Sequence, residues 1–185
     1  NGAGINVGMN FYSNIGRFEI RNSIIADNTG ANDGGGICSY AETTIISNCT
    51  ITGNEAGWAS GVCFYNAGGD SALLLNSIIS QNSTGGSISN TQFYQDENGG
   101  PVVLKNNYSN DFQFNIARSS GNVISLADPF VNRTNGDFSL KSSSPAIGGG
   151  TASIRFEGES ITGSSKDIYN NNRPNPSGSS PDMGA

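Results

Sequence analysis

The sequence predicts an all-β chain, folded as a right-handed parallel β-helix of about four to five coils with an irregular C-terminal cap. Two observations lead to this fold class. A segment of apolar residues followed by Asn-x-x-Ile-x-x-Asn recurs at intervals close to the length of one coil. Each copy alternates in the manner of a strand, whereas apolar stripes with helical spacing are absent from the sequence.

The repeat aligns on its first asparagine, which recurs at intervals of 26, 28 and 30 residues. Apolar residues recur four and two positions before this asparagine and two positions after it. A period of two predicts a strand with one buried face. The aligned residues are Phe18, Ile20 and Ile24, then Thr44, Ile46 and Thr50, then Ala72, Leu74 and Ile78, and finally Val102, Leu104 and Tyr108.

The aligned asparagines share the parity of these apolar residues, which predicts that their side chains face the core. A buried amide needs hydrogen-bond partners, and stacked copies can supply them to one another along the coil axis. Four solvent-facing turn residues are the alternative interpretation. The predicted structural ladder consists of Asn22, Asn48, Asn76 and Asn106.

A second strand follows the glycine-rich turn of each coil. Its apolar column consists of Ile5, Ile37, Val62 and Ile88. Glycine permits the positive φ angles and close stacking that such turns need. The repeat fades after about residue 112. We therefore assign residues 1–112 to the coils, and residues 113–185 to a last coil and a segment that caps it within the same domain.

The composition restricts the partners of the chain. The net charge is −6 and the sequence has no cluster of Lys and Arg, which argues against nucleic acid as a partner. No apolar run approaches the ~20 residues of a membrane helix, and no signal peptide is visible. The first residues already resemble the turn of a coil, so we expect a mature or truncated chain that begins further upstream.

The three cysteines argue against a disulfide framework, because their number is odd. Cys38 and Cys63 each follow the apolar residue of a glycine turn, so stacking of the repeats would place one above the other. The pattern leaves open a disulfide or two stacked free thiols. Cys49 aligns with Ser23 and Ser77, and we expect it to fill space.

The repeats, such as NCTITGN, resemble those of the pectate-lyase-like β-helix superfamily. The tail motifs DPFVN (128–132), GDFSL (136–140), SSPAI (143–147), RP (173–174) and PDMGA (181–185) resemble, in this order, the C-terminal region called choice-of-anchor Q. Gly148 departs from this pattern, which commonly has Asp there. The resemblance implies an extracellular bacterial protein that ends near an anchoring signal. It implies no reaction, because a fold does not determine a function.

The sequence offers no set of catalytic residues. Histidine, the commonest general base, is absent. A glycoside hydrolase needs two carboxylates at one site, yet Asp27 aligns with Gly53 and Gln81 in the neighbouring coils. We therefore expect no catalytic residue within the chain.

An oxygen-rich turn contains Asp27, Asn28, Asn32 and Asp33. Carboxylate and amide oxygens suit calcium, so Asp27 and Asp33 are the candidate metal ligands and calcium is the one cofactor that the sequence suggests. The alternative is a polar turn without a metal, because the spacing matches no known calcium loop.

Aromatic residues give the best indication of a ligand. Tyr40 and Tyr65 occupy one column and face outward by parity, Trp58 lies in the turn before the second of them, and Tyr94 comes one coil later. A ladder of exposed rings can stack on sugar faces, because rings combine apolar area with a polar tip. We expect Tyr40, Trp58, Tyr65 and Tyr94 to bind a ligand. Burial of these rings under loops is the alternative.

These observations favour a non-catalytic extracellular or cell-surface module for adhesion, scaffolding or glycan binding. One alternative is a fragment of a polysaccharide lyase or glycoside hydrolase whose catalytic coils lie upstream. Another is a structural subunit that associates end to end through its first coil. The expected partner is a polysaccharide or cell-surface glycan.

Overall fold

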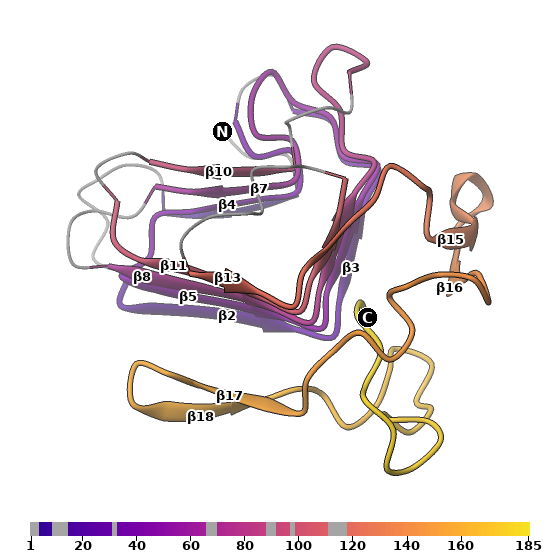
Figure 1. Ribbon diagram of the computed structural model, residues 1–185. Coiled ribbons are helices and arrows are strands. Elements are labelled where there is room, and N and C mark those ends of the chain that lie inside the picture. Colours follow the sequence, from indigo (N-terminus) through magenta and orange to yellow (C-terminus); the bar gives the residue numbers. More distant parts are fainter. Residues whose placement is uncertain are drawn as a thin grey trace.

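The computed structural model describes residues 4–8, 15–30, 33–65, 70–87, 92–96, 99–110 and 118–185, and nearly all of its regular structure is β. Three parallel sheets wind around one core as a β-solenoid (Figure 1). Sheet A contains β1 (Ile5–Val7), β4 (Ile37–Ser39), β7 (Val62–Phe64) and β10 (Phe93–Gln95). Sheet B contains β2 (Arg17–Arg21), β5 (Thr43–Ser47), β8 (Ser71–Leu75), β11 (Val102–Lys105) and β13 (Ser119–Ser120). Sheet C contains β3 (Ile24–Ala26), β6 (Thr50–Thr52), β9 (Ile78–Ser80), β12 (Tyr108–Ser109) and β14 (Val123–Ile124).

The predicted fold class is confirmed, with slightly fewer regular coils than the sequence indicated. Between β1 and β10 the chain makes about three turns. Beyond β11 the stack continues only through short strands, since β12, β13 and β14 contain two residues each. The shorter strands agree with the fading of the repeat near residue 112.

The core lies inside the solenoid. It is formed by the inward residues of sheet B, which precede the first asparagine of each repeat, together with inward residues of sheets A and C. Strand register places Ile20 beside Ile46 and Ile46 beside Leu74, as the alignment predicts. Sheet A contributes Ile37 and Val62, which are register partners and fully buried. The prediction for the positions four and two residues before the asparagine is therefore confirmed.

The first asparagine of each repeat lies at the corner between sheets B and C, and the strand alternation is reversed there. The prediction that the residue two positions after this corner asparagine faces the core is therefore wrong. Asn22, Asn48, Asn76 and Asn106 all have φ between 48° and 53°. Asparagine tolerates this left-handed conformation better than most residues. The turn shifts the inward face by one residue, so Ile25, Ile51 and Ile79 enter the core instead of the residues two positions after the asparagine.

A ladder of side-chain amides does run inside the solenoid, but it is built from the second asparagine of each repeat. Asn28 Nδ2 donates to Asn54 Oδ1 at 2.9 Å, and Asn54 Nδ2 donates to Asn82 Oδ1 at 2.9 Å. Asn82 Nδ2 continues the series to Gln92 Oε1 at 2.7 Å. The amides of Asn54 and Asn82 also bond the backbone of the preceding coil, as in the bond of 3.0 Å from Asn54 Nδ2 to the Ile25 carbonyl.

The C-terminal tail, residues 126–185, runs back along the outside of the stack (Figure 1). It forms one hairpin from β15 (Phe130–Asn132) and β16 (Asp137–Leu140), joined by the 3-10 helix η2 (Arg133–Asn135). A second hairpin contains β17 (Ser153–Phe156) and β18 (Glu159–Thr162). The tail contacts coils from Asn106 back to Arg17, so it covers the flank of the stack rather than only the last coil.

Two apolar faces of the solenoid are buried under this tail. Phe156 and Ile161 of the second hairpin pack on Ile45, Leu73 and Leu75, which point outward from sheet B. The outward column of sheet C, which the parity argument had placed in the core, packs against the first hairpin and the chain end. This cluster contains Ile78, Tyr108, Phe130, Ala146 and Met183.

The predicted ladder of Asn22, Asn48, Asn76 and Asn106 forms a column of corner residues, but the amides of Asn48, Asn76 and Asn106 bond the tail instead of one another. Asn106 Nδ2 donates to the Gly149 carbonyl at 2.8 Å, Asn76 exchanges two bonds with Thr151, and Asn48 Oδ1 accepts from Ser164 N at 2.9 Å. Because the corner turns these side chains outward, their partners are backbone groups of the tail.

Candidate functional site

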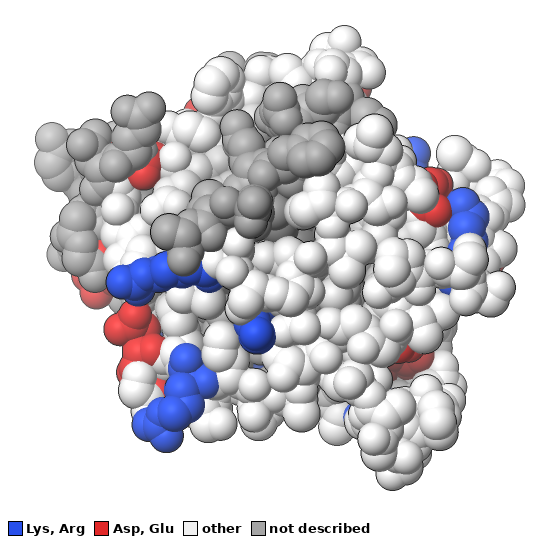
Figure 2. Space-filling model, in the orientation of Figure 1, with Lys and Arg blue, Asp and Glu red and all other residues white. Residues whose placement is uncertain are grey.

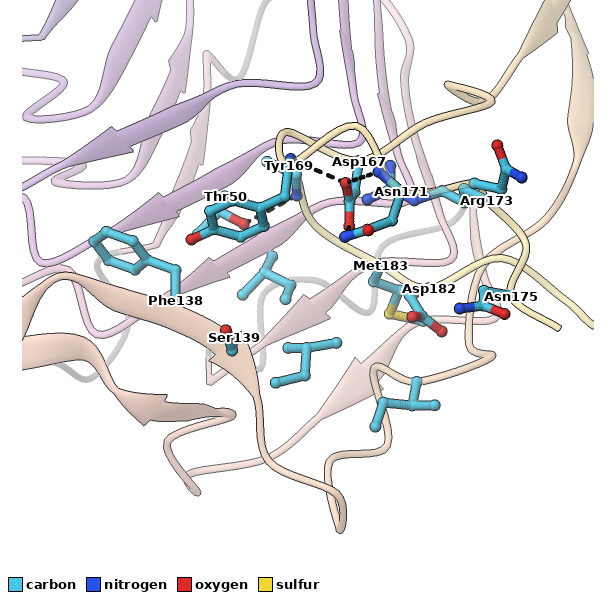
Figure 3. A pocket seen from close by; sticks show the side chains of 15 residues that line it. Thr50, Phe138, Ser139, Asp167, Tyr169, Asn171, Arg173, Asn175, Asp182 and Met183 are labelled. Carbon is cyan, nitrogen blue, oxygen red and sulfur yellow. Dashed lines mark hydrogen bonds between the residues drawn. The ribbon is translucent and has the colours of Figure 1, made fainter.

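A cavity of about 340 Å³ lies between the tail and the outer face of sheet C. Its floor is formed by Thr50 of β6 and Ile78 of β9, and the tail supplies the remaining walls. Figure 3 shows Tyr169, Asp167, Asn171 and Arg173 along one wall, with Phe138 and Ser139 on a strand facing them. Segments that are far apart in the sequence therefore create this site only when the tail docks.

One side of the cavity is apolar and packs on the solenoid. Phe138 and Leu140 of β16 lie against the outward cluster of sheet C, together with Met183. The chain end is fixed to the floor, because Ala185 N donates to Thr50 Oγ1 at 3.1 Å. This wall presents hydrocarbon surface and few competing polar groups.

The opposite wall is a polar loop organised by Asp167. Asp167 Oδ1 accepts from Tyr169 N at 2.9 Å and from Asn171 N at 2.8 Å, while Oδ2 accepts from Asn171 Nδ2 at 2.8 Å. Burial pushes the pKa of Asp167 up, but the hydrogen bonds from Asn171 and Tyr169 lower this pKa on balance. The loop thus holds a carboxylate that stays ionised and fixes its neighbours.

Two further charged groups of this wall retain unused hydrogen-bonding capacity. Arg173 Nη1 is buried without a hydrogen-bond partner, and burial lowers the pKa of Arg173, although Asp167 and Asp182 raise it in part. Asp182 Oδ1 accepts from Gly148 N at 2.7 Å, and within the described part of the chain its second oxygen has no hydrogen-bond partner. Arg173 and Asp182 therefore bring a cationic donor and a carboxylate acceptor to the lining of the cavity.

An exposed ring completes the site. Tyr169 is 59% exposed although it lines the cavity, so its aromatic face is open to a ligand. Asn172 and Asn175 add amides that are exposed to solvent. Opposed apolar and polar walls suit a ligand that has one apolar face and several hydroxyl groups.

The aromatic residues predicted from the sequence gather on the outer face of sheet A. Tyr40 and Tyr65 stack on each other, with ring centroids 4.8 Å apart and ring planes 13° apart. Tyr94 lies against Tyr65 at 5.5 Å and against Trp58 at 5.7 Å. The three tyrosines are half-buried and partly occupy one another's faces, whereas Trp58 is 55% exposed.

The two candidate metal ligands lie in different surroundings. Asp27 pairs with Arg133 of the tail at 3.1 Å, whereas Asp33 accepts a hydrogen bond of 3.1 Å from the Tyr65 hydroxyl. Asn32, which belonged to the same predicted turn, lies outside the described residues. Among the described residues, no group of three His, Cys, Asp or Glu side chains is placed to hold a metal ion.

The sequence analysis did not identify the cavity residues. One signal was available, since the stretch DIYNNNR (167–173) combines an aromatic ring, three amides, a carboxylate and a guanidinium within seven residues. What the sequence does not reveal is the surface of the solenoid against which this stretch docks.

Comparison with known proteins identifies no relative. No protein-family model, curated protein or solved structure matches the chain. Within the described residues, no helix is long and apolar enough to cross a membrane. Arguments about function therefore rest on the geometry of the site.

Proposed function

We propose that the chain is a non-catalytic glycan-binding module that holds a short neutral saccharide in the tail cavity. The observation that carries this proposal is the exposed Tyr169 ring in a cavity that is also lined by Arg173 and Asp182, each of which has an atom without a hydrogen-bond partner among the described residues. A sugar ring can stack its apolar face on an aromatic ring while its hydroxyls bond charged groups and amides.

The size of the cavity agrees with a small ligand. Its volume of about 340 Å³ falls at the lower end of the range for small-molecule sites, about 300–1,000 Å³. A short saccharide, or one end of a longer chain that leaves through the open side, is therefore the expected occupant.

The charges favour a neutral sugar over an acidic one. Two carboxylates, Asp167 and Asp182, accompany the single guanidinium of Arg173 in the cavity wall, and the whole chain carries a net charge of −6. Figure 2 shows Lys and Arg scattered among Asp and Glu on the face in view, without a continuous basic patch. A polyanionic glycan would meet repulsion from this distribution.

The same carboxylates argue against glycosidic bond cleavage. A general acid needs a raised pKa so that it carries a proton near neutral pH. Asp167 instead accepts three hydrogen bonds, and its pKa is lowered. With a lowered pKa, Asp167 is ionised near neutral pH and offers no proton to a leaving group there.

The proposal includes an extracellular or cell-surface location. The resemblance of the tail motifs to choice-of-anchor Q regions supports this placement, and polysaccharides are abundant there. The tail would then have two roles, as the cover of the solenoid flank and as the wall of the binding site.

Retention on immobilised polysaccharides tests the proposal. The panel contains neutral glucans, mannans and galactans beside polygalacturonate and alginate, and the supernatants are assayed for released sugar ends. We expect retention on a neutral polymer without product. The Tyr169→Ala variant should bind about tenfold more weakly, since aromatic stacking contributes about 0.5–1.5 kcal/mol beyond buried area.

Trp58→Ala is the matched control, because Trp58 is about as exposed as Tyr169 but does not line the cavity and packs instead against Tyr94 of β10. Its retention should equal that of the wild type. Retention only on the acidic polymers, release of sugar ends, or loss of binding in Trp58→Ala with unchanged binding in Tyr169→Ala would each overturn the proposal.

A further inference from the structure

The outer face of sheet A brings two of the three thiols together. Cys38 of β4 and Cys63 of β7 are register partners in neighbouring parallel strands. Neighbouring strands lie about 4.8 Å apart, which is inside the window of about 4.4–6.8 Å that disulfide bonds span between Cα atoms. Both side chains leave the same face of the sheet, so their sulfur atoms point in the same direction.

The surroundings isolate this pair from other partners. Cys38 and Cys63 are buried beneath Ala59 and the half-buried rings of Tyr40 and Tyr65. The two residues pack in one cluster, and their mutual influence lowers the pKa of Cys38 and raises that of Cys63, as expected of close neighbours.

The third cysteine is placed where it cannot join them. Cys49 belongs to the core inside the solenoid, whereas the pair lies outside sheet A. Its Sγ donates to the Ser47 carbonyl at 3.3 Å and approaches the Ile20 carbonyl at 3.7 Å. Burial raises the pKa of Cys49 to about 12, which leaves it an inert thiol.

We propose that Cys38 and Cys63 form a covalent modification site, a disulfide that joins two successive coils when the protein meets a small-molecule disulfide such as oxidised glutathione. The thiolate of one cysteine attacks a sulfur of glutathione disulfide and releases one glutathione thiolate. The second cysteine then attacks the protein sulfur of the mixed disulfide and releases the other. The protein loses two electrons and two protons, which the two glutathione molecules gain.

The bond would close a covalent ring around one coil. The chain between Cys38 and Cys63 passes through β5 and β6 of the second coil before it returns to sheet A in the third. The second and third coils would then be joined by a covalent bond in addition to the hydrogen bonds between β4 and β7. This inference is independent of the glycan-binding proposal.

Refolding in a glutathione buffer tests the pairing. In urea all three thiols are accessible and three different single disulfides can form, so the fold alone selects among them. The full chain is diluted from urea into reduced and oxidised glutathione, and its disulfides are then mapped by non-reducing peptide mass spectrometry. We expect a mass lower by two hydrogens, one free thiol at Cys49, and a single cross-linked peptide pair that contains Cys38 and Cys63.

Two variants make the test specific. Cys49→Ser should form the same disulfide, because Cys49 has no part in it, whereas Cys38→Ser should form none. Three free thiols after refolding, or a mixture of pairings that includes Cys49, would overturn the inference.

Discussion

Replacement of Asn54 by alanine tests the interior amide ladder at its centre. Asn54 is fully buried, and its side chain takes part in four hydrogen bonds. Oδ1 accepts from Asn28 N at 3.1 Å and from Asn28 Nδ2 at 2.9 Å. Nδ2 donates to the Ile25 carbonyl at 3.0 Å and to Asn82 Oδ1 at 2.9 Å. Alanine removes all four bonds and leaves a space where the amide had been.

The expected cost follows from the partners that remain. Asn82 Oδ1 still accepts from Asn54 N at 3.0 Å, so the acceptor on that side stays satisfied. Asn28 N loses its partner in a part-buried site, and a buried group left unpaired costs about 1–3 kcal/mol. With the loss of the other bonds, we expect Asn54→Ala to lower the free energy of unfolding by about 2–4 kcal/mol.

Urea unfolding followed by circular dichroism measures this loss, with Asn28→Ala as the matched control. Asn28 lies at the partly exposed end of the ladder, and its replacement removes only its bonds to Asn54 Oδ1 and the Ala26 carbonyl. The control should lose about 1 kcal/mol. If Asn54→Ala lowered the free energy of unfolding no more than Asn28→Ala, the buried hydrogen bonds of the ladder would not stabilise the coils, and the reasoning would be refuted.

Three further outcomes are expected. Phe156→Ala should lower the free energy of unfolding by about 3 kcal/mol in urea titrations, because the hairpin then covers sheet B less well; an unchanged midpoint would contradict this contact. Because hydrogen bonds lower the pKa of Asp167 in the folded state, its stabilisation is complete above about pH 4 and is lost as the pH falls through the folded pKa. Asp167→Asn should therefore show a smaller fall in urea midpoint between pH 7 and pH 3 than the wild type, and equal falls would argue against the role of the carboxylate. The Cys38–Cys63 disulfide should raise the melting temperature of the oxidised protein by several degrees relative to the reduced one in scanning calorimetry, since a loop of this length constrains the unfolded chain by about 3 kcal/mol; coincident melting curves would exclude that effect.

The repeat period and strand alternation were sufficient to predict the solenoid and the columns that precede each corner. The parity argument failed after the corner, because it assumed an uninterrupted strand. A single residue with positive φ, such as Asn48, shifts the inward face from Thr50 to Ile51. Asparagine, with its tolerance of this conformation, was itself the available signal for a corner.

The ladder prediction assigned the right kind of interaction to the wrong asparagine. Each repeat carries two, as in Asn48 and Asn54, and both recur with the coil period. A bond to the tail reveals that the first faces outward, and a bond between two coils reveals that the second faces inward. Periodicity identifies a column of residues but does not say which side of the backbone it occupies.

The candidate site was the least predictable part. Tyr40 and Tyr65 share a column and stack as their spacing indicated, yet their binding role remains a prediction. The cavity depends on the docking of residues 138–185 onto the outward column of sheet C, which includes Ile78. No local pattern encodes that docking, since it joins segments that are distant in the sequence.

The contacts of the tail also depend on the number of coils between its attachment points. Gly149, Thr151 and Ser164 meet the corner asparagines of three successive coils, one tail position to each coil. Most stacked-repeat proteins gain or lose whole repeats with little harm, because each repeat contacts only its neighbours. Here a coil inserted between Asn48 and Asn106 would leave one corner without its tail partner and displace the others from theirs. The number of coils between these two corners is therefore fixed by a segment outside the repeats, and this part of the chain would resist the lengthening and shortening by which repeat proteins commonly diversify.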